Sequence, residues 1–321
     1  MGWLSLVITL MLEQLRPMPA ANPVYSAVRQ VSGWAERNLN AGRRRNGLYA
    51  WLLVVVGLAL VVGAVYAVAS SISVVLGLVV NVAVLFFALG FRQFSHRGTE
   101  IQIALANGDL NAARRELSAW KQQSDPSFTA ADLPQEEVVR QAIEHGLVLA
   151  HRHVFGVFFW FVVLPGPMGA VVYRLAEHVS RVWNRPPPAG TPPDRFGHFA
   201  RRAFAWIDWV PARLTSLGFA IVGDFEGAIY CWRQVSRQAS VDAMPSPDAR
   251  TLILATASGA LGLRLMPAAE VVKHFDEVGN EGAGLEEPTV AALRSVVGLV
   301  WRAMLLWLVL LLALTLAHWL A

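Results

Sequence analysis

The stretch LYAWLLVVVGLALVVGAVYAVA, residues 48–69, decides the fold class. It contains no charged residue, and as a helix it is long enough to cross about 30 Å of hydrocarbon. A second uncharged run, residues 72–91, follows almost directly, so the two runs predict a helical hairpin that turns at Ser70 and Ser71. The chain is therefore predicted to be an integral membrane protein.

The composition of the whole chain agrees with this prediction. Hydrophobic residues make up 55% and charged residues 16% of the chain, a balance typical of proteins that are partly surrounded by lipid. Residues 3–15 are predicted to form a membrane-docked helix, and residues 303–321 a C-terminal span. Trp301, Trp307 and Trp319 lie near the ends of that span, where amphipathic rings favour the headgroup region. The predicted fold class is an all-α, polytopic membrane bundle.

The arginines predict the topology. Arg43, Arg44 and Arg45 precede the first long span, and Arg92 and Arg97 follow the second. Because positively charged flanks stay in the cytoplasm, both flanks are predicted to lie there, in a multi-pass protein of a bacterial inner membrane. The cluster of three arginines is also predicted to anchor the chain to anionic lipid.

Four parts are predicted along the chain. Residues 1–91 hold the N-terminal helix, the basic segment and the hairpin, and residues 92–153 form a cytoplasmic helical lobe. Residues 154–265 form a core of buried or re-entrant helices with a proline-rich loop at 186–193. Residues 266–321 contain a loop and the last span.

The predicted lobe contains several short helices. Thr99 and Asp109 are the predicted N-caps of two of them, and Gly108 ends the first. A further helix is predicted to begin near Pro134 and to run toward residue 154.

The apolar stretch 154–173 is long enough to span the membrane, but Pro165-Gly166-Pro167 interrupts it. Arg174, Arg181 and Arg185 follow, and a full crossing would place them outside the cell. Two half-length helices that enter and leave on the cytoplasmic side satisfy both the break and the charge rule. A kinked span is the alternative.

A block in the second half of the chain, RFG at 195–197 followed by DWVPARLT at 208–215, resembles a signature of the CobD/CbiB family, the membrane-bound cobinamide-phosphate synthases. Other segments resemble the same family in the same order between residues 12 and 265. They are NPV at 22–24, ALANGDL at 104–110, Gly169-Ala170 with Tyr173-Arg174, SPDAR at 246–250 and SGALGLRL at 258–265. Their shared order is stronger evidence than any one motif.

The resemblance implies an ATP-dependent amide bond between adenosylcobyric acid and an aminopropanol-type phosphate, so a corrinoid and ATP-Mg are the expected ligands of a synthase. Acidic and polar positions of the family are occupied here by residues without a carboxylate: Val148, Leu149, Arg152, Phe204 and Ala205. The DWVPARL string is more similar to the AmpE-like branch of the superfamily, which lacks the synthase acids. We expect a non-catalytic, regulatory or ligand-sensing protein, with a divergent cobinamide-phosphate synthase as the alternative.

Charged residues within the resemblance are the candidate ligand-binding positions, because arginine binds phosphate with two parallel hydrogen bonds. They are Arg174, Asp208, Arg213, Asp248 and Arg264. Asp208 and Arg213 lie in an apolar segment, where they either pair with each other or bind a ligand. Asp248 either lines a pocket or belongs to a capped loop. The expected partners are the lipid bilayer, a phosphorylated small molecule or a corrinoid, and a signalling protein, but no nucleic acid.

No metal site is predicted. His151 and His153 lie close to His145, but side chains two residues apart on a helix point about 200° away from each other. Cys231 is the one cysteine of the chain, which excludes a disulfide framework and a thiolate metal cage.

Overall fold

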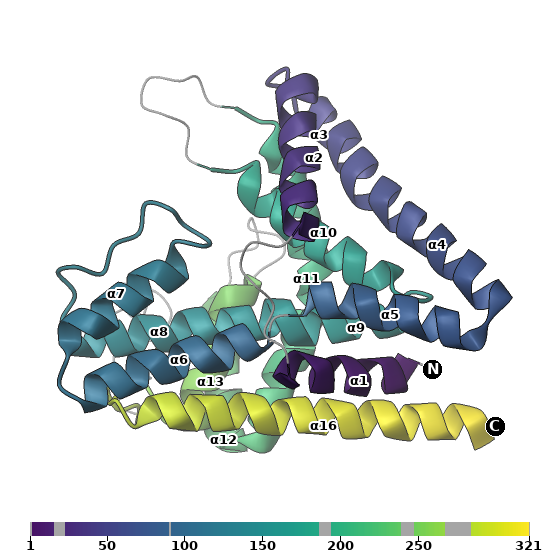
Figure 1. Ribbon diagram of the computed structural model, residues 1–321. Coiled ribbons are helices and arrows are strands. Elements are labelled where there is room, and N and C mark those ends of the chain that lie inside the picture. Colours follow the sequence, from purple (N-terminus) through teal and green to yellow (C-terminus); the bar gives the residue numbers. More distant parts are fainter. Residues whose placement is uncertain are drawn as a thin grey trace. The chain divides into compact units, whose positions relative to one another are not determined.

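The computed structural model describes residues 2–15, 23–89, 91–185, 194–238, 247–266 and 284–320. Its named elements are all helices, so the predicted all-α class is confirmed (Figure 1). Within these residues, three helices are long and apolar enough to cross a membrane: Arg44–Ile72, Gln135–Val163 and Ala292–Ala317. The predicted proline-rich loop at 186–193 lies outside the described residues.

The helices form two compact units. Unit 1 comprises Met1–Gly90 and Arg152–Pro211, and unit 2 comprises Phe91–His151 and Ala212–Ala321. Each unit therefore combines segments that are far apart in the sequence. Residues 152–211 of the predicted core pack with the N-terminal part of the chain.

Unit 1 contains the predicted hairpin. Its elements are α1 (Gly2–Leu15), α2 (Pro23–Leu39), α3 (Arg44–Trp51), η1 (Leu52–Gly57), α4 (Leu58–Ile72), α5 (Val74–Ala88), most of η2 (His151–Phe155), α9 (Gly156–Val163), α10 (Met168–Val182) and the first part of α11 (Gly197–Val222). Here η1 and η2 are π-helical turns, and η1 joins α3 and α4 into one continuous helix.

The hairpin turns slightly later than predicted. Ser73, between α4 and α5, is extended, and its side-chain oxygen accepts a hydrogen bond from Val75 N at 3.2 Å. The second arm, α5, has 15 residues and is therefore about 22 Å long, which is shorter than the predicted span. Leu89 is buried in an extended conformation after the helix, so the apolar run in the sequence is longer than the helix it contains.

The break at Pro165-Gly166-Pro167 is confirmed. Helix α9 ends at Val163, Gly166 adopts a left-handed conformation with φ of 63°, and α10 begins at Met168 and packs back against α9. The helix before the break is longer than predicted, because α8, η2 and α9 form one helix of 29 residues from Gln135. The re-entrant topology of the pair stays a prediction.

Unit 2 contains a buried helix, α13. Its elements are α6 (Phe91–Ala106), α7 (Leu110–Lys121), α8 (Gln135–Ala150), the rest of α11, α12 (Phe225–Gln238), α13 (Ala249–Leu261) and α16 (Ala292–Leu320). Every residue of α13 from Thr251 to Ala260 is buried. Helices α12 and α13 approach closely at two glycines, since a Cβ atom on Gly259 would lie 2.1 Å from the carbonyl oxygen of Gly227.

The predicted helix ends of the lobe are partly correct. Gly108 has a φ of 75° after α6, and the Asp109 side chain caps α7 by accepting from Ala112 N at 2.8 Å. The prediction for Thr99 was wrong, because α6 already begins at Phe91. The ion pair between His96 and Glu100, 3.1 Å long, spans Thr99 and fits a helix that continues through this position.

Candidate functional site

Three arginines surround one buried carboxylate in unit 1. The side chain of Glu177 lies 3.5 Å from Arg174 Nη1, 3.3 Å from Arg181 Nε and 3.9 Å from Arg152 Nη1. Glu177 itself is 5% exposed. We call these four residues the Glu177 cluster.

Local geometry explains how the cluster forms. Arg174 and Arg181 lie three residues before and four residues after Glu177, so all three share one face of α10. Arg152 comes from the π-helical turn η2, and such turns often occur at functional sites. Gly156, the first residue after η2, packs closely against Tyr173 of α10 and so holds η2 beside α10. A Cβ atom on Gly156 would lie 2.2 Å from Tyr173 Oη.

Charge keeps Glu177 ionised. Burial raises the pKa of this carboxyl, but Arg181, Arg174 and Arg152 outweigh burial and lower the pKa to about 2. Three guanidinium groups around one carboxylate leave two positive charges in excess within the cluster. Arg174 Nη1 is buried and makes the ion pair with Glu177, but it forms no hydrogen bond. The cluster can therefore accept a further anionic group.

A second buried carboxylate lies beside the cluster. Asp208 is 2% exposed, and its Oδ1 accepts a hydrogen bond of 2.7 Å from Tyr173 Oη. The ring of Phe204 lies 5.6 Å from the ring of Tyr173 and 5.9 Å from the guanidinium carbon of Arg152. Phe204 thus connects the Tyr173–Asp208 pair with the Glu177 cluster.

Two of the candidate residues, Arg174 and Asp208, lie in unit 1, and Asp208 bonds to Tyr173, the residue before Arg174. Asp248 is the N-cap of α13 and accepts from Thr251 N at 3.4 Å. Arg264 Nη1 forms an exposed ion pair of 2.8 Å with Glu287. These two lie in unit 2.

Two further expectations from the sequence stay predictions. The structure gives Asp208 a partner in Tyr173, and pairing between Asp208 and Arg213 is still to be tested. Arg43, Arg44 and Arg45 are exposed at the start of α3, where Arg43 is the N-cap. Their position next to a candidate span suits the predicted contact with anionic lipid.

Sequence reasoning missed most of the cluster. Glu177 and Arg181 are not among the candidate residues, although an arginine three residues before a glutamate and another four residues after it form a recognisable helical pattern. At position 152, the sequence shows only that a family acid is replaced by arginine. Its contact with Glu177 depends on the packing of two helices, and no local pattern shows it.

The described residues offer no metal site for a Mg²⁺ ion that would accompany ATP. Among them, no group of three or more His, Cys, Asp and Glu side chains lies where it could hold a metal. His145 packs edge-on against Trp120, and His151 Nδ1 lies 2.9 Å from Thr215 Oγ1. Glu177 is surrounded by arginines.

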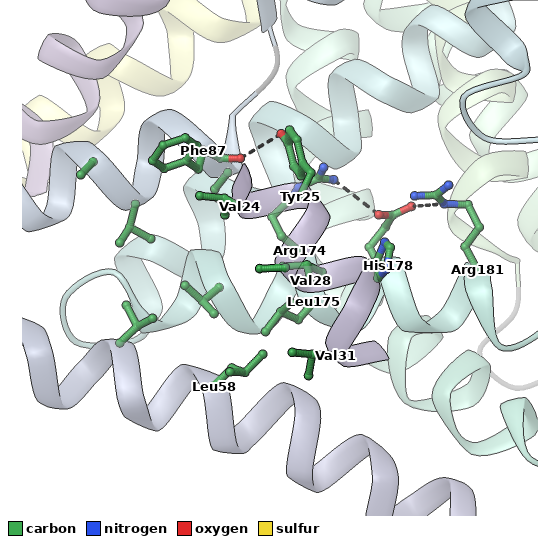
Figure 2. A pocket seen from close by; sticks show the side chains of 17 residues that line it. Val24, Tyr25, Val28, Val31, Leu58, Phe87, Arg174, Leu175, His178 and Arg181 are labelled. Atoms are coloured by element: carbon green, nitrogen blue, oxygen red, sulfur yellow. Dashed lines mark hydrogen bonds and ion pairs between the residues drawn. The ribbon is translucent and has the colours of Figure 1, made fainter. Parts of the chain in front are cut away.

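A cavity of about 530 Å³ adjoins the Glu177 cluster. Figure 2 shows Arg174, His178 and Arg181 at its polar side, and Glu177 also lines it. His178 Nε2 lies 3.1 Å from Ser32 Oγ, and burial together with the charge of Arg181 lowers the pKa of His178 to about 4. The remaining wall is apolar apart from Tyr25, and it comes from α2, α4, α5 and α10.

An all-helical membrane protein with a buried, positively charged site is thus the class that fold and site define. The chain belongs to the CobD/CbiB family, because the model of the CobD/Cbib protein family matches residues 6–300. A cobalamin biosynthesis protein CobD from Stutzerimonas stutzeri is 30% identical over 314 residues, 97% of each chain. A cobalamin biosynthesis protein CobD from Chromobacterium violaceum is 34% identical over 241 residues, 74% of this chain and 71% of that protein. No solved structure matches the chain.

These similarities change the balance between the two functional expectations. Both relatives are named for cobalamin biosynthesis, and neither name supports the AmpE-like, regulatory role expected from the missing acids. Membership of a membrane-protein family and three candidate spans agree with a membrane protein. The inner membrane and the number of crossings stay predictions.

Proposed function

We propose that this protein acts in cobalamin biosynthesis and forms an ATP-dependent amide bond between adenosylcobyric acid and an aminopropanol-type phosphate. The supporting observation is the position of two buried carboxylates. Glu177 contacts Arg152. The hydroxyl of Tyr173 donates a hydrogen bond to Asp208, and the ring of Tyr173 packs against Phe204. Positions 152 and 204 lack the acids of the family, but acids from other positions lie beside them.

In this proposal, Arg152 holds an anionic group of a substrate. Its guanidinium is partly exposed, lies over the face of Phe204 and is 3.9 Å from Glu177. The carboxylate of the corrinoid and the phosphate of the aminopropanol compound are both suitable partners for a planar guanidinium. The excess positive charge of the cluster favours either group.

Asp208 accepts the proton that amide formation releases. In such a reaction, a corrinoid carboxylate oxygen attacks the terminal phosphorus of ATP, the bond from that phosphorus to the bridging oxygen breaks and ADP leaves. The amine nitrogen then attacks the carbonyl carbon of the resulting acyl phosphate. The new C–N bond forms as the C–O bond to phosphate breaks, and the amine loses one proton. Glu177 is already held by three arginines, so Asp208 is assigned this role as the second buried carboxylate of the region, and the hydroxyl of Tyr173 orients it.

Complementation tests this proposal. A bacterium that lacks its own synthase and is supplied with adenosylcobyric acid should grow when it produces this protein. Arg152→Gln and Asp208→Asn should each lower product formation at least tenfold, whereas Arg237→Gln, at an exposed position of α12, should not. If the protein reaches the membrane and no product forms, the proposal fails.

The second candidate function is ligand sensing without turnover. Positions that are acidic or polar in the family favour this alternative, because here they hold Val148, Leu149 and Ala205, which supply no proton acceptor. Under this alternative, the purified protein binds adenosylcobyric acid, Arg152→Gln weakens the binding, and no amide product accumulates. Binding and product formation measured on the same preparation distinguish the two functions.

A further inference from the structure

The cavity beside the Glu177 cluster has two chemically different sides. In the view of Figure 2, Val31 and Leu58 lie toward one end of the cavity, and Arg174, His178 and Arg181 lie toward the other. Other apolar residues of the wall are Val24, Ala27, Val62, Ala83, Val84, Phe87, Ala88 and Val171. Such a site fits a molecule with a hydrocarbon part and a charged end.

The polar side favours a negative charge. Arg174 and Arg181 both line the cavity, and Glu177 is the one acidic residue in the lining. His178 is neutral at neutral pH because its pKa is about 4. Arg174 Nη1 still lacks a hydrogen bond, so a phosphate oxygen would satisfy a buried donor.

The apolar side is formed in part by a candidate membrane span. Leu58 and Val62 belong to the helix Arg44–Ile72, and their neighbours Val61 and Val65 are exposed. Apolar side chains exposed on this helix can therefore face lipid close to the cavity. The volume of about 530 Å³ lies within the range of ordinary ligand sites.

The substrates of the proposed synthase reaction fit this cavity poorly. The aminopropanol-type phosphate is small and polar, and the corrinoid carries polar amide groups around its ring. Neither compound needs an extended wall of valine and leucine side chains, because burying their polar groups there would cost free energy. An amphiphile with a long hydrocarbon chain does need such a wall.

We infer that this cavity binds one acyl chain of an anionic phospholipid, with the lipid phosphate at Arg174 and Arg181. The inference does not rest on the synthase proposal, because it concerns a lipid and a different face of the cluster. Arg152, assigned to the substrate above, does not line the cavity.

Lipid binding to the purified full-length protein in detergent tests the headgroup. We expect labelled phosphatidylglycerol to bind at least tenfold more tightly than phosphatidylcholine with the same chains. Arg174→Gln should remove this preference, whereas Arg201→Gln, at an exposed arginine outside the lining, should keep it. Equal binding of the two lipids to the wild-type protein would overturn the inference.

Variants that fill the cavity test whether the acyl chain of the lipid binds there. Val84→Phe places a larger side chain in the cavity, and we expect it to lower phosphatidylglycerol binding at least tenfold. Val79→Phe makes the same change on the same helix at an exposed position outside the lining and should bind like the wild type. If Val84→Phe does not fold, Val28→Phe fills the cavity from α2. Unchanged binding by a folded cavity variant refutes the inference.

Inorganic phosphate distinguishes the lipid from a free anion. Millimolar phosphate should displace less than half of the bound phosphatidylglycerol, because phosphate lacks the acyl chain that fills the apolar side. Full displacement by phosphate would show an anion site without an acyl chain and would also overturn the inference.

Discussion

Glu177 is kept charged by its neighbours although water scarcely reaches it. Its side chain is 6% exposed, whereas those of Arg152 and Arg181 are about a third exposed. A buried carboxylate without these cations would be protonated or would destabilise the fold. The stability of this region therefore depends more on Glu177 than on any single arginine of the cluster.

Replacing this residue should be costly. Glu177→Gln leaves three partly buried guanidinium groups without their shared carboxylate, and we expect a loss of about 3 kcal/mol of folding free energy. The measurement is thermal unfolding of the purified protein in detergent. Glu226→Gln, at an exposed position of α12, is the control and should change stability by less than about 0.5 kcal/mol.

The difference in stability between the wild type and Glu177→Gln should depend on pH. The folded-state pKa of Glu177 is about 2 and its ordinary value is 4.5. Its contribution is therefore complete above pH 4.5 and is lost as the pH falls toward about 2. The stability difference between wild type and Glu177→Gln should shrink over this range. A stability difference that does not change with pH would show that the charge of Glu177 does not cause it.

At the scale of helices, the close packing of α9 and α10 determines the site. A Cβ atom on Gly169 would lie 1.7 Å from the carbonyl oxygen of Trp160, and a backbone atom cannot move without shifting a helix. Gly156 makes a similar approach to Tyr173. Arg152 reaches α10 because both contacts are this short.

Gly169→Ala should therefore separate the two helices. We expect a loss of at least about 3 kcal/mol, at the upper end of the cost of overpacking. Gly98→Ala is the matched control, since Gly98 lies in α6 with no other atom within 4 Å of its Cβ position. That change should be neutral or stabilise by about 0.5–1 kcal/mol. Equal melting temperatures for the two variants would contradict this account of the packing.

Local signals in the sequence predict local structure here, and they fail where helices meet. Asp109 and Gly108 end their helices as expected because capping depends on a few adjacent residues. Thr99 is an equally suitable cap, yet α6 continues through it. The contact between Arg152 and Glu177 joins positions 25 residues apart across a proline break, so its prediction requires the packing that the glycines allow.

On the scale of the whole molecule, charge and hydrophobicity alone define the expected topology. Three described helices are able to cross a membrane, and the exposed arginines at 43–45 precede the first of them. A re-entrant pair α9–α10 would keep the segments on either side of it in one compartment. A full crossing would place them in opposite compartments.

Cysteine labelling in intact cells distinguishes these topologies. Ser124→Cys and Thr191→Cys should react from the same, cytoplasmic side with a thiol reagent. Cys231 should give little background, because it is buried and burial raises the pKa of its thiol to about 11. Labelling of the two positions from opposite sides would contradict the re-entrant pair and support a kinked span.

The π-helical turn η2 also has an evolutionary consequence. A hydrogen bond in such a turn reaches back five residues, so it holds one residue more than a turn of α-helix. A helix can accommodate one inserted residue in such a turn without forming a loop. Here the enlarged turn includes Arg152, which faces Glu177. A lineage that gained or lost one residue at this place would present a different side chain to that carboxylate while keeping its helices, and so could change its substrate without changing its fold.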